Sequence, residues 1–203
     1  MSEDAAWKDE EVEVDDLHPL LRSRWSPMAF DQRHRATKRQ VDALLEAARW
    51  APSAGNSQPW AFIVARRGED SHGRVVKHLA GSSLRWAPTA SLLVLNLCHR
   101  NVEGTDMDYS EFSHYDLGQA VAHMTIQATA MGLHARQFRA FRRAAVQAEF
   151  AVPDHWEVST ITAFGIPASG GAAPETAPAS ARLGAVRRAL DDLQWPKAGD
   201  VTR

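Results

Sequence analysis

The segment Ala51-Pro-Ser-Ala-Gly-Asn-Ser-Gln-Pro-Trp60 lies between an amphipathic helical pattern and a short apolar run. Its two prolines bracket six small or polar residues, which excludes a helix interior or a central strand. Such a loop offers backbone N–H groups, hydroxyls and two side-chain amides at one place. It therefore suits a planar ligand whose edge presents alternating donors and acceptors. An ordinary surface loop punctuated by Pro and Gly is the alternative interpretation.

A second segment lies upstream and reads Leu21-Arg-Ser-Arg-Trp-Ser-Pro-Met-Ala-Phe-Asp31. If this chain is extended, Arg24, Ser26 and Met28 share one face, because alternate residues of an extended chain point the same way. A guanidinium group and a hydroxyl that converge on one spot suit a phosphate. The alternative is a solvated basic patch.

Together the two segments resemble the flavin-dependent nitroreductase family. The matching stretches are Arg24-Trp-Ser-Pro-Met-Ala-Phe30, a helix to Trp50, Ala51–Trp60, the strand Ala61-Phe-Ile-Val-Ala65, and Tyr115-Asp-Leu-Gly-Gln-Ala120 through Ala130-Met-Gly-Leu133. The resemblance extends from about residue 18 to residue 190. The order and spacing of these motifs make it more specific than any one of them.

Composition favours an ordinary soluble protein. The chain has 203 residues, 44% hydrophobic and 24% charged, with a formal net charge of −2. This length suits one domain, and the charge gives no general attraction to nucleic acid or anionic membranes. The single Cys98 excludes an internal disulfide. No run is long enough to span a membrane, and the acidic N-terminus is unlike a signal peptide, so we expect a cytoplasmic protein.

We expect three regions along the chain. Residues 1–17 form an acidic arm that we expect to be mobile, because repelling carboxylates and few apolar residues do not offset ordering entropy. Residues 18–166 form the folded domain. Residues 167–203 begin with a stretch rich in Pro, Ala, Gly and Ser, which is typical of a linker, and end in a tail that we expect to pack on a partner subunit.

Periodicity predicts the regular elements. Thr37 and Gln40 have capping-box spacing at the start of a helix that ends before Pro52. Apolar residues at three- and four-residue steps predict the longest helix from about Tyr115 to Met131, with Gly132 as its stop. Further expected elements are strands over 61–65, 91–97 and 157–164 and helices over 71–79 and 142–150.

The resemblance implies an α+β fold: a mostly antiparallel central sheet flanked by helices, in an intertwined homodimer with FMN at the interface. It implies that Arg24 and Ser26 meet the FMN phosphate or ribityl chain, joined by Arg187 or its neighbour Arg188. It places Pro52, Ser53, Ala54, Asn56 and Gln58 along the ring, from the other subunit. It places Gln137 and Phe138 beside the ring, with a backbone N–H near Arg139 or Ala140 at flavin N5.

Position 28 departs from the family pattern, which usually has Lys or Arg there. That cation lies near flavin N1 and O2, where negative charge accumulates on reduction, and methionine cannot stabilise it. Arg85 lies in a region that supplies another flavin contact in the family, so it is the candidate substitute for the missing cation. The alternative is that nothing replaces it, and the reduced flavin is then less stable and its potential lower. His114 and Tyr115 are candidate substrate contacts, and no metal ligand set is expected.

The implied function is an FMN-dependent oxidoreductase that passes electrons from NAD(P)H to an organic acceptor, such as a nitroaromatic or quinone, by a ping-pong hydride mechanism. No catalytic side chain is required, since the chemistry occurs at flavin N5. One alternative is a flavin-dependent dehydrogenase of a peptide-derived or heterocyclic substrate. The other is a non-catalytic protein that sequesters flavin, which Met28 favours.

Overall fold

The computed structural model describes residues 16–168 and 187–195. Its centre is an antiparallel sheet of four strands in the order β1-β2-β4-β3. The strands are β1 (Trp60–Arg66), β2 (Leu92–His99), β3 (His134–Phe138) and β4 (Trp156–Gly165). The expected α+β fold with an antiparallel sheet is therefore confirmed.

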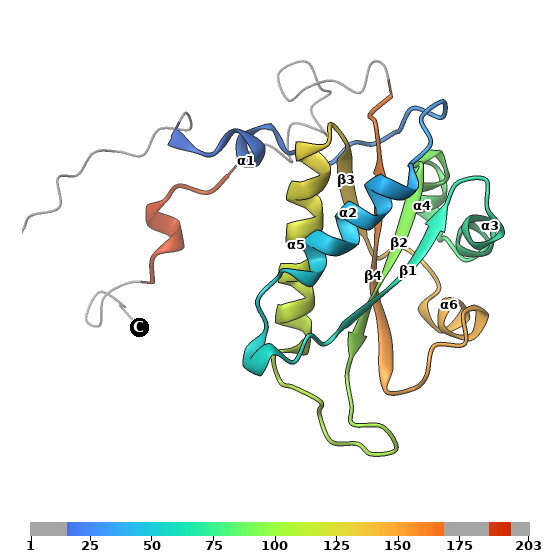
Figure 1. Cartoon of the computed structure of the whole chain (residues 1–203), viewed down its shortest axis with the longest axis vertical. Coiled ribbons are helices and arrows are strands. Elements are labelled where there is room, and N and C mark those ends of the chain that lie inside the picture. Colours follow the sequence, from blue (N-terminus) through green and yellow to red (C-terminus); the bar gives the residue numbers. More distant parts are fainter. Residues whose placement is uncertain (1–15, 169–186, 196–203) are drawn as a thin grey trace, which may run out of the picture.

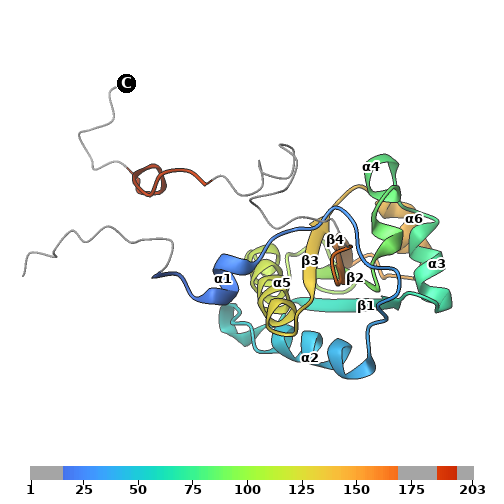
Figure 2. The same cartoon turned by 90° about the horizontal axis from the view of Figure 1, so that it is seen from above.

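Helices cover both faces of this sheet. They are α1 (Pro19–Ser23), α2 (Lys38–Arg49), α3 (Asp70–Val76), α4 (Gly81–Leu84), α5 (Ser113–Ala130) and α6 (Arg143–Glu149). Helices α2 and α5 lie on one side of the sheet, and α3, α4 and α6 lie on the other (Figures 1 and 2). None of the helices in the described residues is both long enough and apolar enough to cross a membrane.

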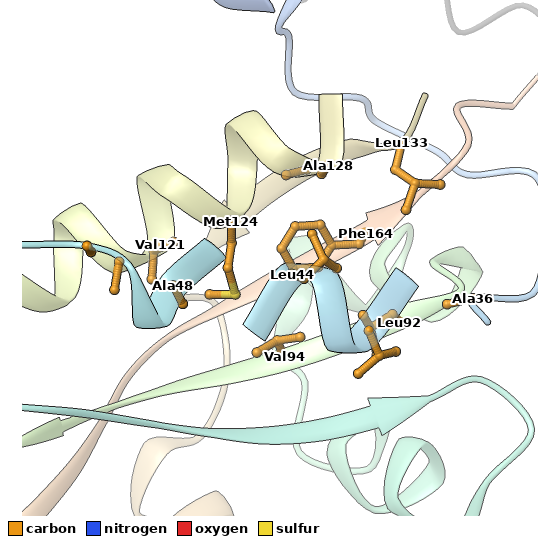
Figure 3. Close-up of a cluster of buried hydrophobic side chains, with 14 of the residues drawn as sticks. Ala36, Leu44, Ala48, Leu92, Val94, Val121, Met124, Ala128, Leu133 and Phe164 are labelled. Atoms are coloured by element: carbon orange, nitrogen blue, oxygen red, sulfur yellow. The ribbon is translucent and has the colours of Figure 1, made fainter. Parts of the chain in front are cut away.

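Strand β2 has buried side chains on both faces, as its apolar sequence predicts. Leu92 and Val94 pack with α2 and α5 (Figure 3), whereas Leu93 and Leu95 belong to the cluster on the opposite face. The thiol of Cys98 is fully buried, and burial raises its pKa to about 11. Cys98 is therefore an inert core residue.

Helix α2 begins with the predicted capping box. The Thr37 hydroxyl accepts from the Gln40 N–H at 3.2 Å, and the Gln40 side chain accepts from the Thr37 N–H at 2.9 Å. These two bonds satisfy two of the free donors at the helix start. The helix ends at Arg49. It therefore fixes where the proline-containing segment 51–60 begins.

Helix α5 has 18 residues and is therefore about 27 Å long. Gly132 follows its C-cap with φ +72°, a conformation that glycine adopts without a steric penalty. The Leu133 N–H then donates back to the Ala128 carbonyl at 2.9 Å. This turn ends the helix and starts the chain toward β3.

Three of the helices and strands were not predicted as such, and the first of them is α1, Pro19–Ser23. The segment that contains β3 was interpreted only as a stretch passing the cofactor, and α4 was not recognised. The expected acidic arm and most of the tail lie outside the described residues. Of the tail, residues 187–195 are described, and Figure 1 shows them apart from the sheet, on the same side as α1.

Candidate functional site

The arginine segment, residues 24–28, follows α1 without regular structure. Arg24 is the C-cap of α1 with extended backbone angles, and its Nη1 donates to the Ser26 hydroxyl at 3.4 Å. The two side chains therefore converge. Partial burial and the nearby positive charge of Arg187 both lower the pKa of Arg24. Two guanidinium groups near a hydroxyl suit an anion such as phosphate.

Arg136 on β3 ties this segment to the sheet. Its Nη1 donates to the Ser26 carbonyl at 3.2 Å, and its guanidinium carbon lies 5.0 Å from the centre of the Trp86 ring. Trp86 in turn packs edge-on against Phe138, with ring centres 5.0 Å apart. Arg136 and Phe138 are alternate residues of one strand, so they project from the same face.

These residues enclose a cavity of about 290 Å³ beside the arginine segment. Its lining consists of Met28, Ser82, Ser83, Arg85, Trp86, Arg136, Phe138 and Ala140. The lining contains two guanidinium groups and two aromatic rings, but no carboxylate. This composition favours a planar ligand that carries negative charge or a polar edge. We call this space the arginine cavity.

The chain that leaves β3 has backbone donors at the edge of the arginine cavity. The Ala140 carbonyl accepts from the Ala80 N–H at 3.0 Å and from the Ser83 hydroxyl, which fixes this turn against α4. Among the described residues, the N–H groups of Arg139 and Ala140 donate no hydrogen bond. They are available to a ligand.

The proline loop, residues 51–60, has an irregular backbone held by its own side chains. Gly55, Asn56 and Gln58 have φ values of +57°, +55° and +48°, which is uncommon for non-glycine residues. The Ser53 hydroxyl accepts from the Gln58 N–H at 3.0 Å. The Gln58 amide donates to the side chain of Asn56 at 3.2 Å. These bonds give the loop one defined shape.

Helix α5 fixes the proline loop from outside. The buried carboxylate of Asp116, in the first turn of α5, accepts from the Ala54 N–H at 3.0 Å. The Tyr109 hydroxyl donates to the Ser57 carbonyl at 3.1 Å. The proline loop is therefore attached to the N-terminal end of α5.

The arginine segment and the proline loop lie at opposite ends of α5 (Figure 1). The loop is bonded at Asp116, whereas the arginine segment is bonded to β3, which follows the C-terminal end of that helix. The length of α5 separates them by roughly 27 Å. One chain therefore does not bring the two sequence motifs together, and a ligand that contacts both requires a second copy.

Known proteins resemble this chain in sequence and in fold. A family model described as the nitroreductase family matches residues 21–103, which include both motifs. A solved structure of an oxidoreductase containing FMN superposes with a TM-score of 0.77 at 26% identity, over 92% of this chain and 94% of that one. The chain resembles the nitroreductase family over residues 21–103, less than half of its length, and a solved oxidoreductase containing FMN over most of its fold.

Two other similar proteins are informative. An oxygen-insensitive NAD(P)H nitroreductase of Salmonella typhimurium is 37% identical over 67 residues. That match spans only 33% of this chain and 30% of the enzyme. A nitroreductase family protein from Clostridium difficile superposes with a TM-score of 0.69 at 22% identity, covering 92% and 99% of the two chains, and supports the fold alone.

The arginine cavity contains some of the cofactor-binding residues expected from the sequence and not others. Met28, Arg85, Phe138 and Ala140 line it. The side chain of Gln137 points to the other face of β3, where its amide lies 3.4 Å from the Thr125 hydroxyl. Sequence reasoning missed Arg136. The alternation of Arg136 with Phe138 would have indicated it, had this segment been interpreted as a strand.

The candidate substrate residues lie elsewhere. His114 and Tyr115 begin α5, close to the proline loop, and His114 contacts the Arg100 guanidinium at 3.3 Å. Tyr115 is 69% exposed. Neither residue lines the arginine cavity. The described residues hold no group of three or more side chains able to bind a metal ion.

Proposed function

We propose that two copies of this chain bind FMN between them and pass electrons from NAD(P)H to an organic acceptor, such as a nitroaromatic or quinone, by a ping-pong mechanism. The observation that carries this proposal is the convergence of Arg24 and Ser26 beside the arginine cavity. The FMN content of a structurally similar oxidoreductase and the name of the Salmonella relative support it.

The donor set fits FMN. Arg24, Ser26 and Arg187 would hold the phosphate and the adjoining ribityl chain, because guanidinium groups form charge-assisted bonds with phosphate oxygens. Trp86 and Phe138 give the arginine cavity an apolar wall, and Ser82 and Arg85 give it donors. Its volume of about 290 Å³ is at the lower limit, roughly 300 Å³, of ordinary ligand pockets. One copy thus offers part of a site.

The second copy would complete the site with its own proline loop. Pro52, Gly55, Asn56 and Gln58 are exposed, and Ser53 and Ala54 lie beside them, so the loop offers polar groups to a ligand outside its own chain. Small or half-exposed residues, Gly118, Ala122 and Ile126, follow an outer stripe of α5. Such residues allow another helix to approach closely. We propose a homodimer in which α5 and this loop face the other copy.

When bound, FMN supplies the two-electron chemistry, so the protein needs no acid or base of its own. The residues of the chain bind and orient the ring, and Trp86 and Phe138 keep water from one face of the arginine cavity. The N–H groups of Arg139 and Ala140, which donate no bond to the described part of the chain, would serve as donors for the ring edge. NAD(P)H and the acceptor would use the same exposed face in turn.

The first prediction is that the purified protein is yellow, with about one FMN per chain, and that NADH or NADPH added under nitrogen bleaches the visible bands. Released cofactor should be FMN rather than FAD. A colourless protein that takes up no FMN in a titration would contradict the proposal. Bound FMN that neither nucleotide reduces would instead favour the sequestering alternative.

The second prediction is that the FMN-loaded protein is a dimer at micromolar concentration. The reason is that the arginine segment and the proline loop of one chain lie at opposite ends of α5, so a ligand that contacts both needs the loop of a second copy. Light scattering coupled to gel filtration measures the mass while absorbance measures flavin content. A monomer that retains one FMN per chain would show that the proline loop is not part of the site.

A further inference from the structure

Arg136 is the most completely fixed cation in the arginine cavity. It bonds to the Ser26 carbonyl on one side and lies over the Trp86 ring on the other. A guanidinium group has five N–H donors, and this bond uses one nitrogen. Its other donors have no partner among residues 16–168 and 187–195, and they can face a ligand in the cavity that Arg136 lines.

Arg85 lines the same cavity but is held differently. It is exposed, and among the described residues it forms no hydrogen bond or ion pair. Fixing such a long side chain against a ligand costs conformational entropy. Arg136 has already lost much of that freedom, so its charge is preorganised. Met28, which is 53% exposed on the cavity wall, carries no charge.

The surroundings of Arg136 strengthen its field. No carboxylate lines the cavity, and part of the side chain is withdrawn from water, which lowers its pKa. An arginine remains charged despite such a shift. A cation that is partly withdrawn from water, in a cavity without carboxylates, interacts more strongly with an anion than a fully exposed cation does.

We propose that Arg136 stabilises the negative charge that the FMN ring carries at N1 and the C2 carbonyl after two-electron reduction, the task that Met28 cannot perform. This inference rests on the proposed function. The arginine segment would hold the phosphate end, and Arg136 bonds that segment at the Ser26 carbonyl and lines the cavity beside it, so its guanidinium would face the ring end of the ligand. Arg85 has a secondary, adjustable role.

The test compares the two-electron potential of bound FMN in the wild type and in Arg136→Gln, by equilibration with reference dyes. We expect Arg136→Gln to weaken binding of reduced FMN, relative to oxidised FMN, on the order of tenfold. This ratio lowers the potential by about 30 mV. Oxidised FMN should bind Arg136→Gln within about threefold of the wild-type affinity, since its ring carries no such charge.

Three further variants sharpen the comparison. Arg136→Met keeps the apolar contact with Trp86 without the charge, and it should lower the potential as Arg136→Gln does. With two variants, the comparison can be made with one of them if the other folds poorly. Arg142→Gln is the matched control, because Arg142 also donates to one backbone carbonyl, that of Lys77 at 2.7 Å, but does not line the cavity. Combining Arg136→Gln with Met28→Lys should restore the potential.

The outcomes separate this inference from the proposed function. A wild-type protein that binds no FMN overturns both. A wild type that binds FMN, with Arg136→Gln or Arg136→Met folded and unchanged in potential, overturns the inference alone. Melting temperatures that fall while the potential stays constant would make Arg136 a structural link between Ser26 and Trp86. An equal shift in Arg142→Gln would also overturn the inference.

Discussion

Replacing Arg24 by alanine should weaken FMN binding by about 2–3 kcal/mol, the usual loss when a charge-assisted bond to phosphate is removed. This corresponds to a dissociation constant about 30- to 150-fold larger. The physical reason is that Arg24 converges with Ser26 and lies near the charge of Arg187. Titration of the apoprotein, followed by quenching of flavin fluorescence, measures the constant.

Riboflavin provides the decisive control, because it lacks the phosphate. Its affinity should hardly change in Arg24→Ala. The matched surface variant is Arg33→Ala, since Arg33 forms an exposed ion pair with Asp31 at 3.0 Å and lies outside the proposed site. Arg33→Ala should leave FMN affinity within about twofold. Equal losses for FMN and riboflavin in Arg24→Ala would show that Arg24 supports the structure instead.

Local sequence signals were sufficient where neighbours in the chain decide the structure. The Thr37–Gln40 capping box and the glycine stop at Gly132 depend on residues within one or two helical turns, and both occur as predicted. The apolar run of β2 was enough to predict a strand buried on both faces. In these cases the pattern itself contains the energetic reason for the structure.

Contacts between distant residues could not be predicted in this way. The bond from Arg136 to the Ser26 carbonyl joins residues 110 positions apart, and no periodic pattern reports such a pair. The placement of the two motifs at opposite ends of α5 depends on how α2, α5 and the sheet pack. Sequence spacing gives the motifs, whereas only the packed structure shows that one chain separates them.

Asp116 allows a prediction that links loop and helix. Its side chain is 2% exposed, and one oxygen accepts from the Ala54 N–H at 3.0 Å. The other lies 3.4 Å from the Gln119 amide. A carboxylate in the first turn of a helix also interacts favourably with the helix dipole. Asp116 therefore holds the proline loop against α5.

Asp116→Ala should lower the free energy of unfolding of the apoprotein by about 2–3 kcal/mol, because the part-buried Ala54 N–H loses its partner and the helix loses its charge. Asp116→Asn keeps an acceptor oxygen and should cost about 1 kcal/mol. Asp42→Ala, which removes an exposed ion pair with Lys38 at 2.6 Å, should cost less than about 0.5 kcal/mol. Urea unfolding at one protein concentration measures all three.

Hydrogen exchange at the Ala54 amide localises the effect. In the wild type, the bond to Asp116 should protect this amide, and in Asp116→Ala the amide should exchange at least tenfold faster, since its opening no longer breaks a hydrogen bond to a carboxylate. FMN affinity should fall with it, because the loop carries Asn56 and Gln58 toward the other copy. If stability falls but Ala54 protection and FMN affinity do not, Asp116 stabilises α5 alone, and the shape of the proline loop has another cause.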